Sequence, residues 1–371
     1  MDVYITRDEL TRAVGAVQGV ADRRSTNHIL GHMLLEASED GLRVTATDTE
    51  ITLVSNHSAR VEAPGSTTVN AAHFHQVARA LPDGTVRLQL EEGQRLRVEA
   101  GPALFRLVGS DAADFPSVPD FEPSTQLTVS SPELRRLIDQ TLFAIPVDDN
   151  RYGLNGGHLE NLENEEGQTL LRLVTTDGSR LCFAQTVYEG DFGMQSHMLI
   201  PRKALGEIRR LLDRVDGGAT IEFGERAARI QLESATLHAR LVDGEFPAYR
   251  SVLPPSYQRL VSVRRDDFAT ALKRVSVEAQ DRSGIMRMEV GAEGMVLSSR
   301  TVDQGEAQHP VEAELEGEPI TIGFNVRFFQ DVVNCIESDV VRLEMGTGLA
   351  PCVVKAQESD NVLFVVMPMR L

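Results

Sequence analysis

Histidine, aspartate and cysteine are the residues from which catalytic and metal sites are usually built, and in this chain of 371 residues they are scattered. The nine histidines, His158 and His238 among them, include no H-E-x-x-H pair. Asp177 in "TTDGSRL" could act as a catalytic acid, but Asp-Gly is first a turn signal, and "TATDTEI" holds the same aspartate at position 48. We therefore interpret these residues as structural.

The short motifs of common enzyme classes are missing as well. The chain contains no G-x-x-x-x-G-K-[ST], no G-x-G-x-x-G and no G-x-S-x-G. Cys182, Cys335 and Cys352 lie far apart with no C-x-x-C pair, which favours reduced, buried thiols over disulfides or a zinc site. We expect no catalytic site, no cofactor and no metal ion.

The end of the chain, "VVMPMRL" at 365 to 371, is unusually apolar for a terminus. Chain ends are normally polar and frayed, because each CH₂ group left in water forgoes about 0.8 kcal/mol of burial free energy. The composition therefore predicts that this segment packs against an apolar surface.

Length and composition indicate a folded protein of two or three domains, with 42% hydrophobic residues to fill their cores. No apolar run approaches the roughly 20 residues that cross a bilayer. The N-terminus "MDVYITRDEL" lacks the basic and apolar regions of a signal peptide. We expect a cytoplasmic protein that does not enter a membrane.

Three segments open alike, each as a short alternating strand that runs into a helix: "VYITRDEL" at 3 to 10, "QLTVSSPEL" at 126 to 134 and "LVSVRRDDF" at 260 to 268. Apolar residues then recur at i, i+3, i+4 and i+7, which predicts amphipathic helices. In the second copy, Ser131, Pro132 and Glu133 predict an N-cap, a proline at the first helical position and a first-turn acid. Such self-similarity indicates an internal repeat.

A second strand and helix follow in each copy, at "TTVNAAHFHQVARAL", "HMLIPRKALGEIRRLL" and "ITIGFNVRFFQDVVNCI", and β-rich stretches come after them. Prolines cluster between the copies. We predict three α+β domains at 1–120, 126–250 and 256–371, each a two-layer structure with two helices on one face of antiparallel sheets.

Charge is distributed unevenly over this acidic chain, whose net charge is −18. Basic residues concentrate on the solvent faces of the predicted helices, for example at Arg135, Arg136, Arg209 and Arg210. One such face is usually only a solvated helix surface, but several within one repeat family suggest a positive lining.

Taken in order, "TRDEL", "TATDTEI", "DFP", "RYGLNG", "VTTDGSRL", "IPRKAL", "LVDGEFPAYRSVLP", "IGFNVRF" and "VVMPMRL" resemble the bacterial β sliding clamps, the beta subunits of DNA polymerase III, over the whole chain. The resemblance implies the DNA clamp fold and a head-to-tail homodimer closed into a six-domain ring, whose helices line a hole that holds duplex DNA. It implies a processivity factor without a catalytic site of its own.

The resemblance also implies an apolar groove between the second and third domains, completed by the C-terminal segment. It would receive short linear peptides of the Gln-Leu-x-Leu-Phe type from the DNA polymerase III alpha subunit, the clamp-loader delta subunit, other polymerases and repair proteins. Matched by motif, the groove and its polar rim comprise Arg151, Leu154, Thr176, Gly178, Arg180, Leu181, Pro247, Val252, Asn325, Val365, Met367, Pro368, Met369 and Arg370. Methionine suits this task because its flexible thioether repacks around different guests.

Two further sets of residues follow from the same resemblance. DNA contacts are expected at Arg24, Arg202 and Lys203, and subunit contacts at Phe105, Leu107 and Val277. The sequence departs from the family pattern at Gly153, where many relatives carry an aromatic residue, and in the acidic pair Asp148 and Asp149. Glu278 stands where a leucine is expected, so the subunit interface would rely more on charge.

An alternative interpretation is a three-domain adaptor that binds peptides through the terminal groove and does not encircle DNA. A gel-filtration mass equal to one subunit would favour the adaptor over the ring.

Overall fold

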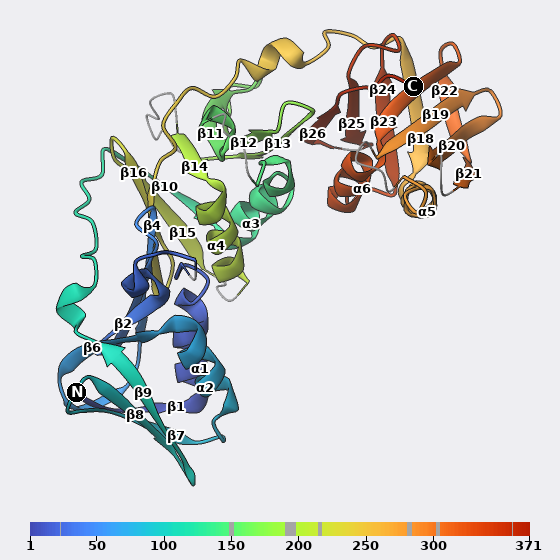
Figure 1. Cartoon of the computed structure of the whole chain (residues 1–371). Helices are drawn as coiled ribbons and strands as arrows, with labels where there is room; N and C mark the ends of the chain where they lie inside the picture. The colour runs from blue at the N-terminus through green and yellow to red at the C-terminus, as the bar shows by residue number, and fades with distance from the viewer. Residues whose placement is uncertain are drawn as a thin grey trace. The chain divides into compact units, whose positions relative to one another are not determined.

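The computed structural model describes residues 1–22, 24–147, 152–189, 198–213, 217–279, 284–301, 305–357 and 359–371. In this part of the chain there are six α-helices and 26 β-strands (Figure 1). The helices are α1 (Arg7–Val17), α2 (Ala71–Ala80), α3 (Ser131–Asp139), α4 (Arg202–Leu212), α5 (Arg265–Val275) and α6 (Val326–Cys335). Each predicted domain therefore contains two helices.

The strands repeat in the same order around those helices. The first predicted domain holds β1 (Asp2–Thr6), β2 (His32–Ser38), β3 (Gly41–Thr47), β4 (Ile51–His57), β5 (Arg60–Ala63), β6 (Gly65–Asn70), β7 (Thr85–Glu91), β8 (Arg95–Ala100) and β9 (Ala103–Ser110). The second holds β10 (Thr125–Ser130), β11 (Gly156–Glu163), β12 (Thr169–Thr176), β13 (Arg180–Val187), β14 (Met198–Pro201), β15 (Gly218–Phe223), β16 (Ala227–Gln231) and β17 (Ala235–Arg240). The third holds β18 (Arg259–Arg264), β19 (Ile285–Gly291), β20 (Gly294–Thr301), β21 (Gly305–Val311), β22 (Ala313–Glu316), β23 (Ile320–Asn325), β24 (Val340–Met345), β25 (Cys352–Ala356) and β26 (Ser359–Val366).

The apolar stripes of the helices form the cores, as their spacing predicts. The buried helix residues include Leu10, Val14 and Val17 of α1, Phe74 and Val77 of α2, Leu134, Leu137 and Ile138 of α3, Leu205, Ile208 and Leu212 of α4, Phe268, Leu272 and Val275 of α5, and Phe329 and Val332 of α6. The predicted internal repeat, with two helices and many more strands in each copy, is confirmed.

The chain packs into two compact units. One comprises residues 1–134 and 203–241, and the other comprises 135–202 and 242–371. The strands of the second predicted domain are thus divided between the units, so each unit contains one boundary between successive repeats. The domain limits themselves remain a prediction.

In the first unit, a sheet of thirteen strands runs in the order β10-β15-β16-β17-β4-β3-β2-β6-β9-β8-β7-β1-β5. The boundary between the first two repeats lies where β17 pairs antiparallel with β4, with Leu237 opposite Leu53. Both leucines are buried.

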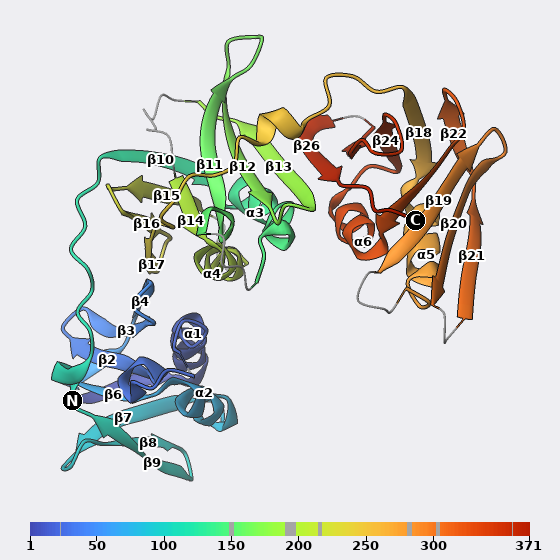
Figure 2. The same ribbon diagram turned by 45° about the horizontal axis from the view of Figure 1, so that its top comes forward.

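In the second unit, a sheet of nine strands runs β14-β11-β12-β13-β26-β25-β24-β18-β22, beside a sheet of four in the order β21-β20-β19-β23 (Figure 2). The boundary between the second and third repeats lies where β26 pairs antiparallel with β13, with Val365 opposite Leu181. The last strand of one repeat therefore pairs with the same hairpin strand of the repeat before it, at both boundaries.

The start of α3 corrects one prediction. Ser131 is the first helical residue, and the cap is Ser130: its Oγ accepts a hydrogen bond from the Glu133 N–H at 3.4 Å and donates one to Glu133 Oε2 at 2.5 Å. A serine three residues before a glutamate is the spacing of a capping box, although here the return bond to the carboxylate comes from the Ser130 hydroxyl. The N-cap is therefore the serine three residues before Glu133, and not the serine next to Pro132.

The corrected cap can be tested by a pair of alanine substitutions. Ser130→Ala should lower the free energy of unfolding by about 1 kcal/mol, because it removes the cap of α3. Ser131→Ala should have almost no effect, since the buried Ser131 Oγ has no hydrogen-bond partner in the part of the chain that the structure describes. Urea unfolding of both variants provides the measurement. A larger loss for Ser131→Ala would restore Ser131 as the cap.

Candidate functional site

The site begins at the turn between β12 and β13, where the predicted Asp-Gly signal lies. Asp177 Oδ1 accepts hydrogen bonds from the N–H groups of Ser179 (2.9 Å) and Arg180 (3.0 Å). Gly178 has φ of +85°, a conformation that glycine adopts without steric cost. Asp177 therefore shapes a turn, as its sequence context predicts.

The first repeat builds the same turn between β3 and β4. Asp48 Oδ1 accepts from the N–H groups of Glu50 (2.9 Å) and Ile51 (2.8 Å), and Thr49 takes the left-handed position with φ of +79°. The common interpretation of Asp48 and Asp177 as turn residues is confirmed.

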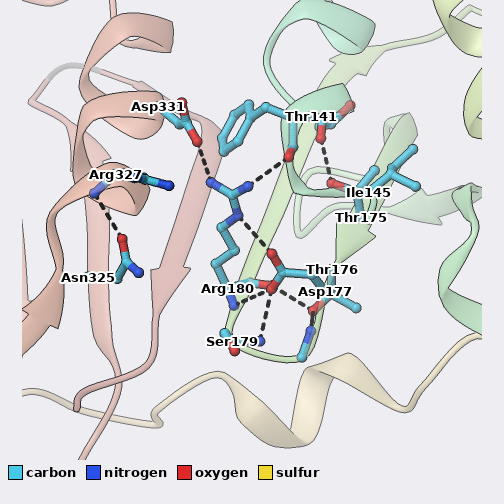
Figure 3. A network of polar contacts seen from close by, with 12 residues as sticks. Thr141, Ile145, Thr175, Thr176, Asp177, Ser179, Arg180, Asn325, Arg327 and Asp331 are labelled. Carbon is cyan, nitrogen blue, oxygen red and sulfur yellow. Dashed lines mark hydrogen bonds and ion pairs between the residues drawn. The ribbon is translucent and has the colours of Figure 1, made fainter. Parts of the chain in front are cut away.

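Arg180 lies at the centre of a polar network that includes the turn (Figure 3). Its guanidinium donates to Asp177 Oδ2 (3.0 Å), to Asp331 Oδ2 of α6 (2.5 Å) and to the carbonyl of Phe143 (2.8 Å). Only 11% of the Arg180 side chain is exposed. Two carboxylates and a carbonyl thus hold this charge in one place.

The C-terminal segment packs against this turn, which confirms that the apolar chain end is docked. Val365 and Val366 are buried in β26. Beyond the strand, the Met367 N–H donates to the Ser179 carbonyl (2.9 Å) and the Met369 N–H to the Gly323 carbonyl (2.8 Å). These bonds fix the backbone, while the side chains of Met367 and Met369 remain half-buried.

A pocket of about 400 Å³ opens between the turn, the chain end and the 3₁₀ segments η4 (Tyr152–Leu154) and η5 (Tyr249–Val252). The predicted groove residues that line it are Leu154, Thr176, Gly178, Arg180, Leu181, Pro247, Val252, Val365 and Met367. Its lining is mainly apolar with a few polar groups, which is typical of a binding pocket. We refer to it below as the groove.

The other predicted groove residues that the structure describes do not line this pocket. Asn325 caps α6, accepting from the Arg327 N–H at 2.9 Å (Figure 3). Pro368, Met369 and Arg370 follow Met367 in the chain-end segment but are not among the lining residues. Arg151 lies outside the described residues, as do Asp148 and Asp149.

Three lining residues are missing from the sequence prediction: Gly153, Glu245 and Tyr249. Tyr249 had a signal, since an aromatic residue two places after Pro247 continues an apolar segment that already supplied Pro247 and Val252. No such signal marks Glu245, because a glutamate in a loop belongs to no sequence pattern that indicates a groove.

Tyr249 is a wall of the groove held by charged neighbours. It is 5% exposed and packs with Leu181, Phe183 and Val365. Its hydroxyl donates to Glu160 Oε1 and accepts from Arg172 Nη1 at 2.9 Å.

The same contacts shift two pKa values. Burial raises the pKa of Glu160, but hydrogen bonds from His158 and Tyr249 outweigh it, so the pKa of Glu160 falls below its usual value. Burial and the neighbouring Glu160 raise the pKa of Tyr249. Tyr249 is therefore a protonated donor to an ionised carboxylate near neutral pH.

Two larger hollows lie on the four-stranded sheet of the third repeat. One, of about 850 Å³, is bordered by Glu289, Glu293 and Glu312, and the other, of about 800 Å³, by charged residues that include Arg287 and Arg300. Both hollows are bordered by several charged side chains, and polar groups make up a larger part of their lining than of the lining of the groove. The groove is the better candidate for specific binding despite its smaller volume.

The predicted DNA contacts are placed as follows. Arg24 is exposed. Arg202 donates to the carbonyls of Leu142 (2.7 Å) and Ile145, and burial, with a smaller effect of Arg180, lowers its pKa. Lys203 is partly exposed and donates to Asp48 and to the Val20 carbonyl (3.0 Å).

The predicted subunit contacts lie on β9 and after α5. Phe105 is half-buried and Leu107 is 5% exposed within the single chain, so Leu107 already belongs to a core. Val277 is 58% exposed. Glu278 is partly buried, and among the described residues its Oε2 has no hydrogen-bond partner.

One arrangement resembles a catalytic triad that the sequence did not indicate. Ser55 Oγ lies 2.7 Å from His57 Nε2, and His57 Nδ1 lies 2.6 Å from Glu9 Oε1. Ser55 is 1% exposed and His57 8% exposed, so a substrate cannot reach the hydroxyl. We interpret the trio as a buried hydrogen-bond chain that connects α1 to β4.

The described part of the chain contains no cluster of three or more histidine, cysteine or acidic side chains arranged to hold a metal ion. Cys182, Cys335 and Cys352 are free thiols, as predicted. Cys182 and Cys352 are buried, whereas Cys335 is half-buried, and burial raises the pKa of Cys335 to about 12. No helix in the same residues has the length and apolar character needed to cross a membrane.

Comparison with known proteins places these features in a family. Three family models match in succession: the N-terminal domain of the DNA polymerase III beta subunit at residues 1–119, the central domain at 128–248 and the C-terminal domain at 250–370. The chain is 34% identical over 372 residues to a protein named beta sliding clamp from Vibrio cholerae, and 31% identical over 373 residues to one from Escherichia coli, with 100% of each chain covered.

Solved structures give the same result. A crystal structure of the Caulobacter crescentus beta sliding clamp superposes with a TM-score of 0.93 at 33% identity, covering 100% of this chain and 99% of that one. A sliding clamp from Bartonella birtlesii, bound to griselimycin, superposes with a TM-score of 0.95 at 31% identity and full coverage of both chains.

Because the Tyr249 hydroxyl donates a hydrogen bond to Glu160, the effect of Tyr249→Phe on stability should depend on pH. The lowered pKa of Glu160 means that its contacts stabilise the fold above the usual carboxyl pKa of about 4.3, and that this stabilisation is lost as pH falls through the folded-state pKa. Tyr249→Phe should therefore cost about 1.5 kcal/mol of unfolding free energy at pH 7 and progressively less below about pH 4.

Urea unfolding at several pH values measures this difference. Tyr257→Phe is the matched control, because Tyr257 is 46% exposed, and it should change stability at neither pH. A loss from Tyr249→Phe that is equal at neutral and acidic pH would contradict a role for the bond to Glu160.

Proposed function

Because this chain belongs to the family of DNA polymerase III beta subunits, the beta sliding clamps, we propose that two copies close head to tail into a six-domain ring around duplex DNA. The ring tethers polymerases to their template and so confers processivity. It acts in the cytoplasm and has no catalytic centre of its own.

The strand pairing between successive repeats is the observation that best supports a ring. The strand β17 of the second repeat pairs with β4 of the first, and β26 of the third pairs with β13 of the second. If this pattern continued, β9, the last strand of the first repeat, would pair with β21. The strand β21 holds the same place in the third repeat as β4 and β13 hold in the first and second.

Both of these strands have an unpaired edge in the described chain. The strand β9 pairs with β8 along its length but with β6 only at Gly109 and Ser110, and β21 is the outer strand of its sheet. Exposed edges of this kind are templates for another strand. A second copy supplies the missing partner at each end, which closes the ring head to tail.

The predicted interface residues fit this pairing. Phe105 lies on β9, and Val277 follows α5, which packs against β21. Phe105 is half-buried and Val277 mostly exposed in the single chain, so both have apolar surface left to bury. We propose that they meet across the interface, next to Leu107.

Sequence-independent binding of DNA requires phosphate contacts from basic side chains. We propose Arg24, Arg202 and Lys203 as such contacts. Arg24 is exposed for this purpose, whereas Arg202 and Lys203 also hold neighbouring segments together. Because Arg202 and Lys203 also serve the fold, we propose that topology rather than affinity keeps the ring on DNA.

In this proposal, partner proteins are held to the ring through the groove. We propose that it takes short linear motifs of the DNA polymerase III alpha subunit, the clamp-loader delta subunit, other polymerases and repair proteins. Its apolar walls, Leu154, Leu181 and Val365, suit leucine and phenylalanine anchors.

Encirclement predicts that retention depends on the shape of the DNA. Protein loaded by a clamp loader onto nicked circular DNA should remain bound in salt that removes ordinary phosphate contacts, because a closed ring is released only by opening or by sliding off an end. Linearising the circle should release it. Gel filtration of the protein with labelled DNA measures both states, and equal loss from circles and from linear DNA would exclude the ring.

The interface predicts a weaker dimer for Phe105→Ala. Truncating this side chain should raise the dimer dissociation constant roughly tenfold or more while the subunit stays folded, because the phenyl ring packs between subunits. Leu104→Ala is the control, since Leu104 lies on the opposite face of the same strand and is 45% exposed.

Sedimentation and circular dichroism provide the two measurements. Leu107 is left intact, because it is buried in the chain and its loss would also weaken the core. An unchanged dimer in Phe105→Ala would contradict the proposed edge, and a wild-type protein of one-subunit mass would favour the adaptor.

A further inference from the structure

We propose that the groove prefers peptides with a lysine or arginine beside their apolar anchors, and that Glu245 recognises this positive charge. The inference rests on the proposed function of the groove as a peptide site. It adds a chemical preference among the peptides that the groove admits.

The charges around the groove carry the argument. Among its described lining residues, the ionised side chains are Arg180 and Glu245. The positive charge of Arg180 is already countered by Asp177 at 3.0 Å and Asp331 at 2.5 Å. Together these four groups leave a surplus of negative charge beside an apolar pocket.

Of these three carboxylates, Glu245 is the one that has no partner among the described residues. It is exposed, and within the described residues its side chain makes no hydrogen bond or ion pair. Asp177 and Asp331, by contrast, both bind Arg180. An incoming ammonium or guanidinium group can therefore pair with Glu245 without displacing a contact that holds the fold.

Gly153 makes this position of Glu245 possible. A Cβ atom added at Gly153 would lie 2.4 Å from the Glu245 carbonyl oxygen, far inside the limit for such a contact. Any larger residue at this place would push the 245 backbone away. The glycine thus both leaves the pocket open and lets the Glu245 segment close over η4.

The residues next to Glu245 hold its backbone in place. The ring of Phe246 stacks on His158 with centroids 5.1 Å apart and planes 11° from parallel. On the other side, the Val242 N–H donates to the Leu199 carbonyl at 2.9 Å. A carboxylate on a fixed backbone loses less conformational freedom when it pairs with a ligand, so it can discriminate.

The test compares charged versions of one peptide. The probes are fluorescein-labelled Lys-Gln-Leu-Ser-Leu-Phe-Lys and Glu-Gln-Leu-Ser-Leu-Phe-Glu, titrated by anisotropy with the full-length protein. Flanking both ends makes the test independent of the direction in which the peptide lies. At about 50 mM salt the lysine probe should bind several-fold more tightly than the glutamate probe, and less so at about 500 mM.

Variants separate Glu245 from the general charge of the protein. The net charge of −18 attracts any basic peptide, so Glu92→Gln, an exposed carboxylate that does not line the groove, is the matched control. Glu245→Gln should reduce the lysine preference about two- to fivefold, Glu245→Lys should remove or invert it, and Glu92→Gln should leave it unchanged.

The outcomes distinguish this inference from the function on which it rests. If neither probe binds the wild-type protein, the groove is not a peptide site. If both probes bind and Glu245→Lys keeps the full lysine preference, or Glu92→Gln reduces it as much as Glu245→Gln does, Glu245 does not read charge and the inference fails.

Discussion

Strand pairing across the boundary between repeats is the interaction on which the rest of this structure depends. Where β26 pairs with β13, the end of the chain becomes part of a sheet that begins in the preceding repeat. Leu181 and Val365 lie opposite each other in that pairing, and both line the groove. The groove therefore exists only because the two repeats share a sheet, and an apolar chain end stays docked because its strand has a partner.

An ion pair from a helix of the later repeat to the hairpin turn of the earlier one reinforces each boundary. Lys203 of α4 binds Asp48, and Asp331 of α6 binds Arg180. The two pairs do not involve matching residues, since Asp48 corresponds to Asp177 and not to Arg180, but in both pairs one partner lies on the second helix of the later repeat. This explains why Lys203, predicted as a DNA contact, also serves the fold, and why Arg180, predicted at the rim of the groove, is held rigidly.

Much of the fold could be predicted from sequence, because the helix stripes and turn signals are local and repeat along the chain. The features that escaped prediction depend on contacts between distant segments. Ser130 could have been chosen over Ser131 from its spacing to Glu133, a local rule that the neighbouring proline obscured. The position of Glu245 beside the groove could not have been predicted, because it depends on how closely the Glu245 backbone approaches Gly153. Gly153 lies ninety-two residues earlier, and the sequence gives no sign of this contact.

The groove combines residues that are held in fixed positions with residues that can adapt, and the fixed ones form the rigid floor, on which a peptide would rest, together with its walls. Tyr249 and Arg180 are held by carboxylates, while Val252 is 39% exposed and Met367 is half-buried with its backbone bonded to Ser179. A rigid floor keeps the anchor positions constant, and a flexible thioether above it can repack around different side chains. We propose that such a site binds many related motifs with similar strength, and that partners exchange by competition and differ in affinity mainly through contacts at the edge, where Glu245 lies.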